Sequence, residues 1–144
     1  MRRMLSQCAR LLPMVLVAAA CRAGATRAHE RTQPVNVNVT CSGNQIKIVV
    51  NPSRVTFKHT GGIWPHGPTD VPWALDARAD VPQVTIAPDG EWPFESPTPP
   101  AVPRGNSSVG VGRASQAKGM YRYSITASCP GGPTGIFDPD IWVD

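Results

Sequence analysis

After residue 30 the sequence lacks any run of helix-forming residues with a 3.6-residue hydrophobic period, and 16 prolines and 13 glycines interrupt the chain. It also lacks a long hydrophobic run. The most apolar stretch, residues 11–20, has about half of the roughly 20 residues that a helix needs to cross a bilayer. We therefore expect neither a helical fold nor a membrane span.

An excess of positive charge is absent once the first 28 residues are set aside. The whole chain has 14 basic and 10 acidic residues, but five arginines and no acidic residue precede position 29. Residues 29–144 therefore contain nine basic and ten acidic residues. The remainder holds no cluster of Lys or Arg interleaved with aromatics, so we expect no nucleic-acid partner.

Motifs of catalysis are also missing. The chain has no Gly-x-Ser-x-Gly, no His-Glu-x-x-His and no phosphate-binding glycine loop. Glu91 and Glu95 are four residues apart, but Pro93 argues against a helix that would present both on one face. Asp138, Asp140 and Asp144 lack the pattern of a calcium loop and are interpreted as a solvated strand edge. We expect the protein not to be an enzyme.

The N-terminus has the pattern of an export signal. Arg2 and Arg3 precede the apolar residues 11–20, and small residues offer cleavage points after Ala20, Ala25 or Ala28. We therefore interpret residues 1–28 as a secretory signal peptide and residues 29–144 as one exported domain, periplasmic or extracellular.

Cleavage after Ala20 would give a different product. The segment VAAAC at residues 17–21 resembles the lipobox of bacterial lipoproteins, in which the cysteine is lipidated, although the usual leucine is absent. In that case the signal is residues 1–20, and Cys21 carries a lipid anchor.

The exported domain retains two cysteines, Cys41 and Cys129, in an oxidising compartment. Each is in phase with the apolar residues of its segment, so both should face the core. We expect a disulfide between them that encloses most of the domain, with a contribution to stability of about 4 to 5 kcal/mol.

Alternation of apolar and polar residues predicts strands through most of the chain. The clearest segments are residues 35–41 and 121–129. Residues 45–50 and 54–59 flank a turn at 51–53 and should pair as a hairpin. Shorter segments are expected at 83–87, with Val84 and Ile86 inward, at 107–112, with Val109 and Val111, and at 137–143. The pattern indicates an all-β fold, a single Greek-key β-sandwich of about seven strands with long Pro/Gly-rich loops.

The order of these segments resembles that of small exported cupredoxin-like domains. The resemblance rests on VTF at residues 55–57, GMYRYSI at 119–125 and DPDIWV at 138–143. An immunoglobulin-like sandwich fits the same pattern. The resemblance implies a type 1 copper site, but no His or Met follows Cys129, so that ligand set is missing and no cofactor is expected.

Residues 60–82 are expected to form a long irregular connection that could carry a binding site. Trp64, His66, Asp70 and Trp73 lie in it and are the candidate contacts for a ligand or partner. The alternative is that the two tryptophans fold back to fill one end of the sandwich. His59 and His66 could hold a metal ion, although their spacing is not that of a common site. Residues 88–106 form a second irregular, proline-rich region.

Two functions remain open from the sequence. The first is a non-catalytic binding or structural module of the cell envelope, with an unknown envelope component or small ligand as its partner. The second is a metal-handling or redox protein related to cupredoxins, with a different ligand set.

Mass spectrometry of the exported protein tests the processing. We expect the mass of residues 29–144, or of residues 21–144 with added lipid, and alkylation of Cys41 and Cys129 only after reduction. A full-length chain, or alkylation without reductant, would contradict these expectations.

Overall fold

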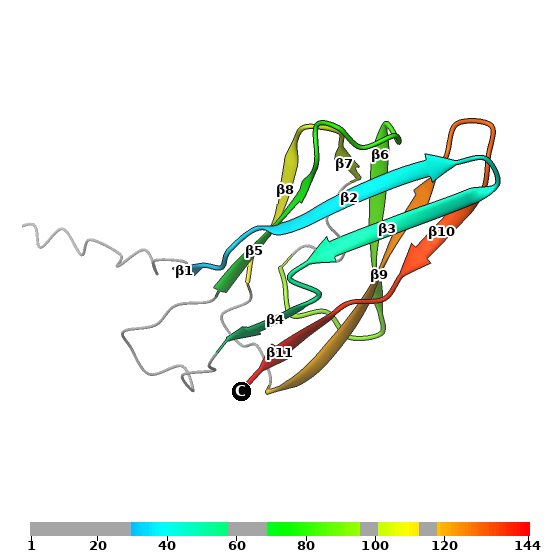
Figure 1. Ribbon diagram of the computed structural model, residues 1–144. Coiled ribbons are helices and arrows are strands. Elements are labelled where there is room, and N and C mark those ends of the chain that lie inside the picture. The colour runs from blue at the N-terminus through cyan, green and yellow to red at the C-terminus, as the bar shows by residue number, and fades with distance from the viewer. Residues whose placement is uncertain (1–29, 58–68, 96–100, 113–117) are drawn as a thin grey trace, which may run out of the picture.

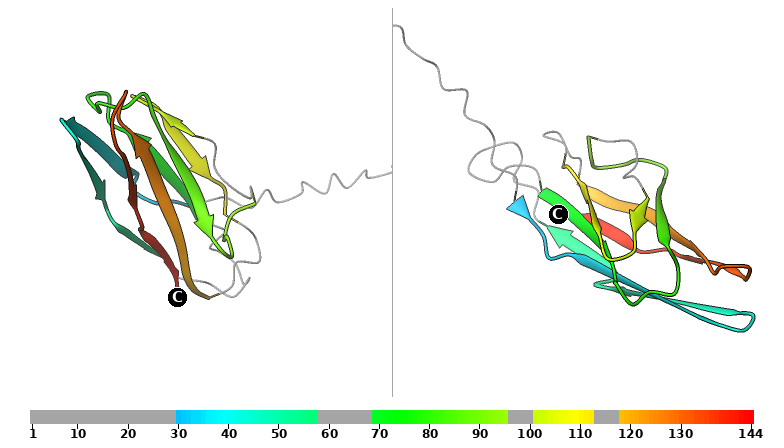
Figure 2. Two further views of the ribbon diagram at one scale, coloured as in Figure 1. Left: turned by 90° about the vertical axis from the view of Figure 1, so that its right-hand side faces the viewer. Right: turned by 90° about the horizontal axis from the view of Figure 1, so that it is seen from above.

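The computed structural model describes residues 30–57, 69–95, 101–112 and 118–144. These residues form eleven strands and no helix, so none of them provides a helix that could span a membrane. The strands make two sheets that pack face to face as a β-sandwich (Figures 1 and 2). This arrangement confirms the all-β sandwich expected from the sequence.

The first sheet is built around β5, which pairs in parallel with β1 and β2 and antiparallel with β8, while β3 pairs with β2. Its strands are β1 (Glu30–Arg31), β2 (Val35–Ser42), β3 (Gln45–Asn51), β5 (Thr69–Leu75) and β8 (Ser107–Gly110). One edge of β2 pairs with β3. On the opposite edge, beyond the part paired with β5, the amides of Asp76 and Asp80 donate to the carbonyls of Val37 and Val39.

The second sheet is built around the long strand β9, which pairs antiparallel with β6, β10 and β11. Two strands lie outside these, since β4 pairs in parallel with β11 and β7 pairs with β6. Its strands are β4 (Arg54–Phe57), β6 (Gln83–Asp89), β7 (Val102–Pro103), β9 (Gly119–Ser128), β10 (Thr134–Phe137) and β11 (Asp140–Val143).

Strands β10 and β11 pair with successive parts of the same edge of β9. Phe137 lies opposite Ile125 and Asp140 lies opposite Arg122, so the register is the same on both sides of the break. The break contains Pro139, which has no N–H to donate to a ladder. Residues 136, 138, 140 and 142 therefore share the outer face of this sheet.

Large aromatic side chains fill the space between the sheets. Trp73 of β5 stacks on Trp92, with ring centroids 5.9 Å apart, and meets Phe94 and Tyr123 edge to face at 5.6 and 5.7 Å. Its indole N–H donates to the Tyr123 hydroxyl at 3.1 Å, so the buried polar atoms of both rings are paired across the sandwich. Aliphatic side chains surround these rings, among them Val35, Val37, Val39, Leu75, Ile86, Ile125 and Ile141.

The disulfide between Cys41 and Cys129 is present, with Cα atoms 6.0 Å apart. It joins the end of β2 in the first sheet to the residue after β9 in the second. Nearby, Gly135 of β10 lies so close to β3 that a Cβ atom there would be 2.8 Å from the Cγ2 of Ile46. The two sheets are therefore held together both by a covalent bond and by close packing at this end.

The structure corrects three expectations about the strands. Residues 45–51 and 54–57 do not form a hairpin, because the turn between them carries the chain into the other sheet, where β4 pairs with β11. Residues 69–75 are a strand and not part of an irregular loop. Pro72 argues against a strand in the sequence because proline has no N–H to donate. In the structure it lies between the part of β5 paired with β1 and the part paired with β2.

The third correction concerns the phase of β8. Val109 is half-buried and Val111 is exposed, while Gly110 is the residue that faces the core. The reason is space, because the rings of Trp73 and Phe94 fill the volume that a side chain at position 110 would need. The second irregular region is also more ordered than expected, since β6 runs to Asp89 and Trp92 is buried in the core.

The substitution Gly110→Ala tests this packing. An added Cβ would lie 2.8 Å from Cζ3 of Trp73 and 3.1 Å from Cδ2 of Phe94, so we expect a loss of about 1 to 3 kcal/mol in the free energy of unfolding. Urea denaturation measures the loss. Ser107→Ala, at an exposed position of the same strand, is the control and should change stability by less than about 0.5 kcal/mol. Equal stability of the two variants would contradict the packing described.

Candidate binding site

Of the four residues proposed from the sequence as contacts, the structure describes Asp70 and Trp73, and neither lies on the surface. Trp73 is fully buried in the aromatic core, which supports the alternative that it fills the sandwich. Asp70 is also buried, and its Oδ1 accepts a hydrogen bond from the amide of Gly112 at 3.0 Å. Asp70 therefore bonds to the segment that follows β8, and Trp73 packs between the two sheets. Trp64, His66, His59 and Cys21 lie outside the described residues.

The metal hypothesis gains no support from the cysteines. Cys129 is bonded to Cys41, so its sulfur is not available as the thiolate that a type 1 copper site requires. Among residues 30–57, 69–95, 101–112 and 118–144, no three His, Cys, Asp or Glu side chains are grouped so that they could hold a metal ion.

A different set of residues forms a line of alternating charge across the second sheet. Arg54 of β4 lies opposite Asp140 of β11, Asp140 lies opposite Arg122 of β9, and Arg122 lies opposite Asp89 of β6. We call these four residues the charge row. Because Tyr121 and Tyr123 point into the core, Arg122 between them must point outward. The charge row is therefore on the outer face of the sandwich.

One half of the charge row is tightly paired. The guanidinium of Arg54 donates two hydrogen bonds to the Asp140 carboxylate, at 2.6 and 2.8 Å, and lies over the Trp142 ring with its carbon 5.1 Å from the centroid. The hydrogen bond from Arg54 lowers the pKa of Asp140, and the charge of Arg122 acts in the same direction. Asp140 is therefore ionised at neutral pH, and its carboxylate is held in one orientation.

The other half of the charge row is unpaired. The side chains of Arg122 and Asp89 form no hydrogen bond or ion pair with any described residue, although they lie on adjacent strands. Asp138, opposite Ser124 on the same face, has no such partner either among the residues that the structure describes. One guanidinium and two carboxylates thus retain hydrogen-bonding capacity that the fold does not use.

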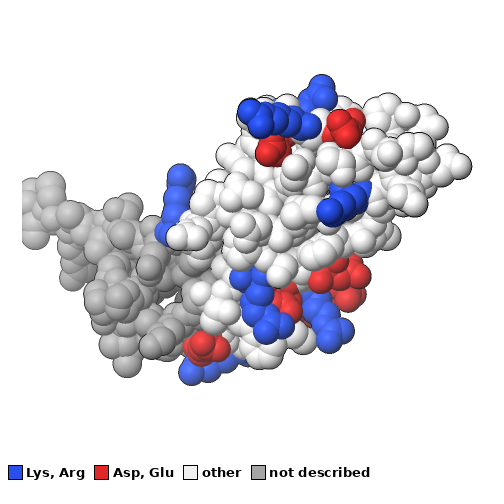
Figure 3. Space-filling view, viewed as in Figure 1, with Lys and Arg blue, Asp and Glu red and all other residues white. Residues whose placement is uncertain are grey.

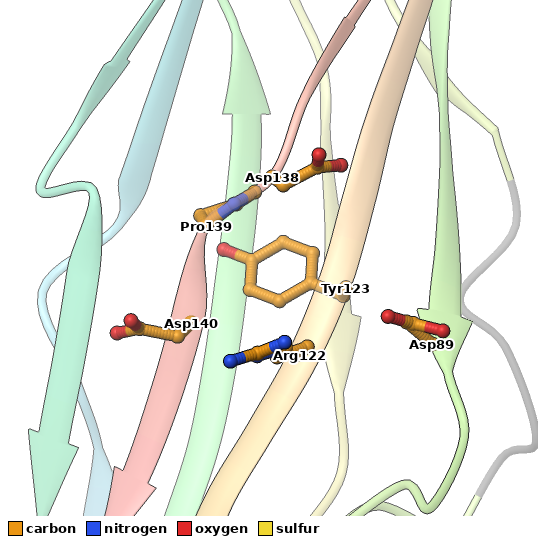
Figure 4. Close-up of a pocket in the computed structure, with 6 residues that line it drawn as sticks. All are labelled: Asp89, Arg122, Tyr123, Asp138, Pro139 and Asp140. Carbon is orange, nitrogen blue, oxygen red and sulfur yellow. The ribbon is translucent and has the colours of Figure 1, made fainter.

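These side chains surround a hollow of about 330 Å³. Figure 4 shows Arg122 between Asp140 and Asp89, with Asp138 and Pro139 at the neighbouring part of the wall. Tyr123 completes the lining. Every wall residue belongs to β6, β9 or β11 or to the short break before β11, so the hollow is built on paired strands and not on a long loop.

The surface around this region is mixed in sign. On the face shown in Figure 3, basic and acidic side chains lie beside one another over the lower half, where β4 and β11 run, and neither sign forms an extended patch on that face. Next to the charge row, Met120 lies opposite Trp142 and is 40% exposed, which adds an apolar group to the same surface.

Sequence reasoning missed this site although one signal was present. Arg122 is out of phase with the inward residues of its strand, and Asp138 and Asp140 are in phase with each other, so both sets could be placed on an outer face. What the sequence did not show was the pairing of β11 with β9 and of β9 with β6, which brings Asp140, Arg122 and Asp89 to one level.

Comparison with known proteins does not place the chain in a family. No protein-family model matches it, and no curated protein is significantly similar to it.

Titration of Tyr123 tests the geometry under the hollow. Burial raises the pKa of Tyr123 to about 12, whereas an unfolded tyrosine titrates near 10. The stability that its neutral form provides is therefore complete below about pH 10 and decreases as the pH rises toward 12.

We expect near-ultraviolet absorbance of the folded protein to show Tyr123 ionising near pH 12. Tyr123→Phe should remove this late transition. If the ionisation that Tyr123→Phe removes lies near pH 10 in the folded protein, the buried position of this ring is contradicted.

Proposed function

We propose that the protein is an exported, non-catalytic binding module of the cell envelope, and that the hollow at the charge row is its contact surface. The observation that carries this proposal is the unpaired state of Arg122, Asp89 and Asp138 beside the paired Asp140. Polar groups held on rigid strands and left without internal partners are suited to an external ligand.

Export is supported by two independent features. Residues 1–28 have the charge and hydrophobic pattern of a secretory signal, and the remaining domain contains a disulfide that joins its two sheets. Disulfides of this kind persist in oxidising compartments. A lipid on Cys21 would tether the same domain to a membrane surface and would leave the hollow on the sandwich unchanged.

A cupredoxin-like Greek-key fold is compatible with the two-sheet sandwich, and we keep it as part of the proposal. The alternative of a metal-handling protein depends on His59 and His66, which lie outside the described residues. No described contact favours it, since the sulfur of Cys129 is bonded to Cys41.

Sedimentation with envelope fragments of the cells that export the protein tests this function. We expect the purified protein to sediment with the fragments, and the double variant Arg122→Ala/Asp89→Ala to bind at least about tenfold more weakly, because it removes charged hydrogen-bonding groups.

The matched control is Asn36→Ala/Lys47→Ala, two exposed residues of β2 and β3 in the other sheet. It should bind as the parent does. Absence of sedimentation, or equal retention of all three proteins, would overturn the assignment of the contact surface.

A further inference from the structure

We propose that the ligand of the hollow is a neutral saccharide, an inference that rests on the proposed function and specifies its chemistry. Donors and acceptors alternate along the charge row. Arg122 provides only donors, and it stands between Asp89 and Asp140, which provide only acceptors when ionised.

A sugar hydroxyl satisfies both kinds of group because it donates one hydrogen bond and accepts others. Hydroxyls on adjacent ring carbons can therefore accept from the Arg122 guanidinium while donating to the neighbouring carboxylates. Asp138 adds a further acceptor to the wall of the hollow, two residues before Asp140 along the chain. A ligand with only acceptors, such as a phosphate, would satisfy Arg122 and be repelled by Asp89 and Asp138.

The balance of charge supports a neutral ligand over a charged one. Three aspartates and two arginines meet at this site, so their charges nearly cancel and leave a formal charge of −1. A basic peptide would pair with Asp89 and Asp138, but it would be opposed by the unpaired Arg122. A polyanion would be opposed by the carboxylates, one of which Arg54 already neutralises.

The site is also arranged before any ligand arrives. Arg54 holds Asp140 through two hydrogen bonds and rests on Trp142, so this carboxylate loses little freedom on binding. The hollow of about 330 Å³ falls at the lower end of the range for small-molecule sites, which suits a short stretch of glycan more than a folded partner.

Amide-resolved NMR titration with maltohexaose, cellohexaose and mannohexaose, each at millimolar concentration, tests the inference. We expect at least one of them to shift the amides of residues 89, 122–124, 138 and 140–142 selectively, with little dependence on NaCl because the ligand carries no charge. The variant Arg122→Gln should weaken that binding about tenfold or more. Asn36→Ala on the other sheet is the control.

Hexalysine provides the opposing measurement. If the hollow selects cations, hexalysine will shift the same amides, high salt will abolish the effect, and Arg122→Gln will strengthen binding because it removes a like charge. That pattern would overturn the saccharide inference. Urea midpoints of the variants show whether a loss of binding reflects unfolding.

Periodate separates this inference from the proposed function. Periodate cleaves the carbon–carbon bond between adjacent hydroxyl-bearing carbons. Envelope fragments that have been treated with periodate and washed should therefore no longer bind the protein. Fragments treated with protease should still bind it. If binding still depends on Arg122 and Asp89 but survives periodate, and no hexasaccharide shifts the amides, the saccharide is excluded and the contact surface stands.

Discussion

The contact between Trp73 and Tyr123 is the interaction on which the rest of the structure depends. It joins the central strand of one sheet to the central strand of the other through a ring contact and a hydrogen bond of 3.1 Å. Trp92 and Phe94 complete the cluster, and Gly110 leaves room for it. With few large residues available, a small domain gains much of its buried apolar area from such a cluster.

The direction of Tyr123 also determines the outer surface. Since side chains alternate along a strand, an inward Tyr121 and Tyr123 place Arg122 outside, and the register of β6 and β11 then places Asp89 and Asp140 beside it. The disulfide between Cys41 and Cys129 holds the sheets together farther along β9, at the end away from the hollow. Core packing thus positions the charge row without using its side chains.

The charge row contains two kinds of electrostatic pair. Arg54 and Asp140 are satisfied by each other, and an exposed pair of this kind contributes little to stability but orients its members. Arg122 forms no hydrogen bond or salt bridge with a described residue, although Asp140 and Asp89 lie on the strands beside it. One line of four residues thus contains both an ion pair and two charged side chains that form no hydrogen bond or salt bridge with a described residue.

The sequence by itself determined the all-β sandwich and the disulfide, because strand alternation and the phase of Cys41 and Cys129 are local properties. It misjudged the hairpin at residues 45–57, the loop around Trp73 and the inward side of β8, because strand partners and available core volume depend on distant residues. Only the tertiary structure brought Arg54, Asp140, Arg122 and Asp89 to one level. Strand register joins residues that are up to 86 positions apart, and no local pattern specifies it.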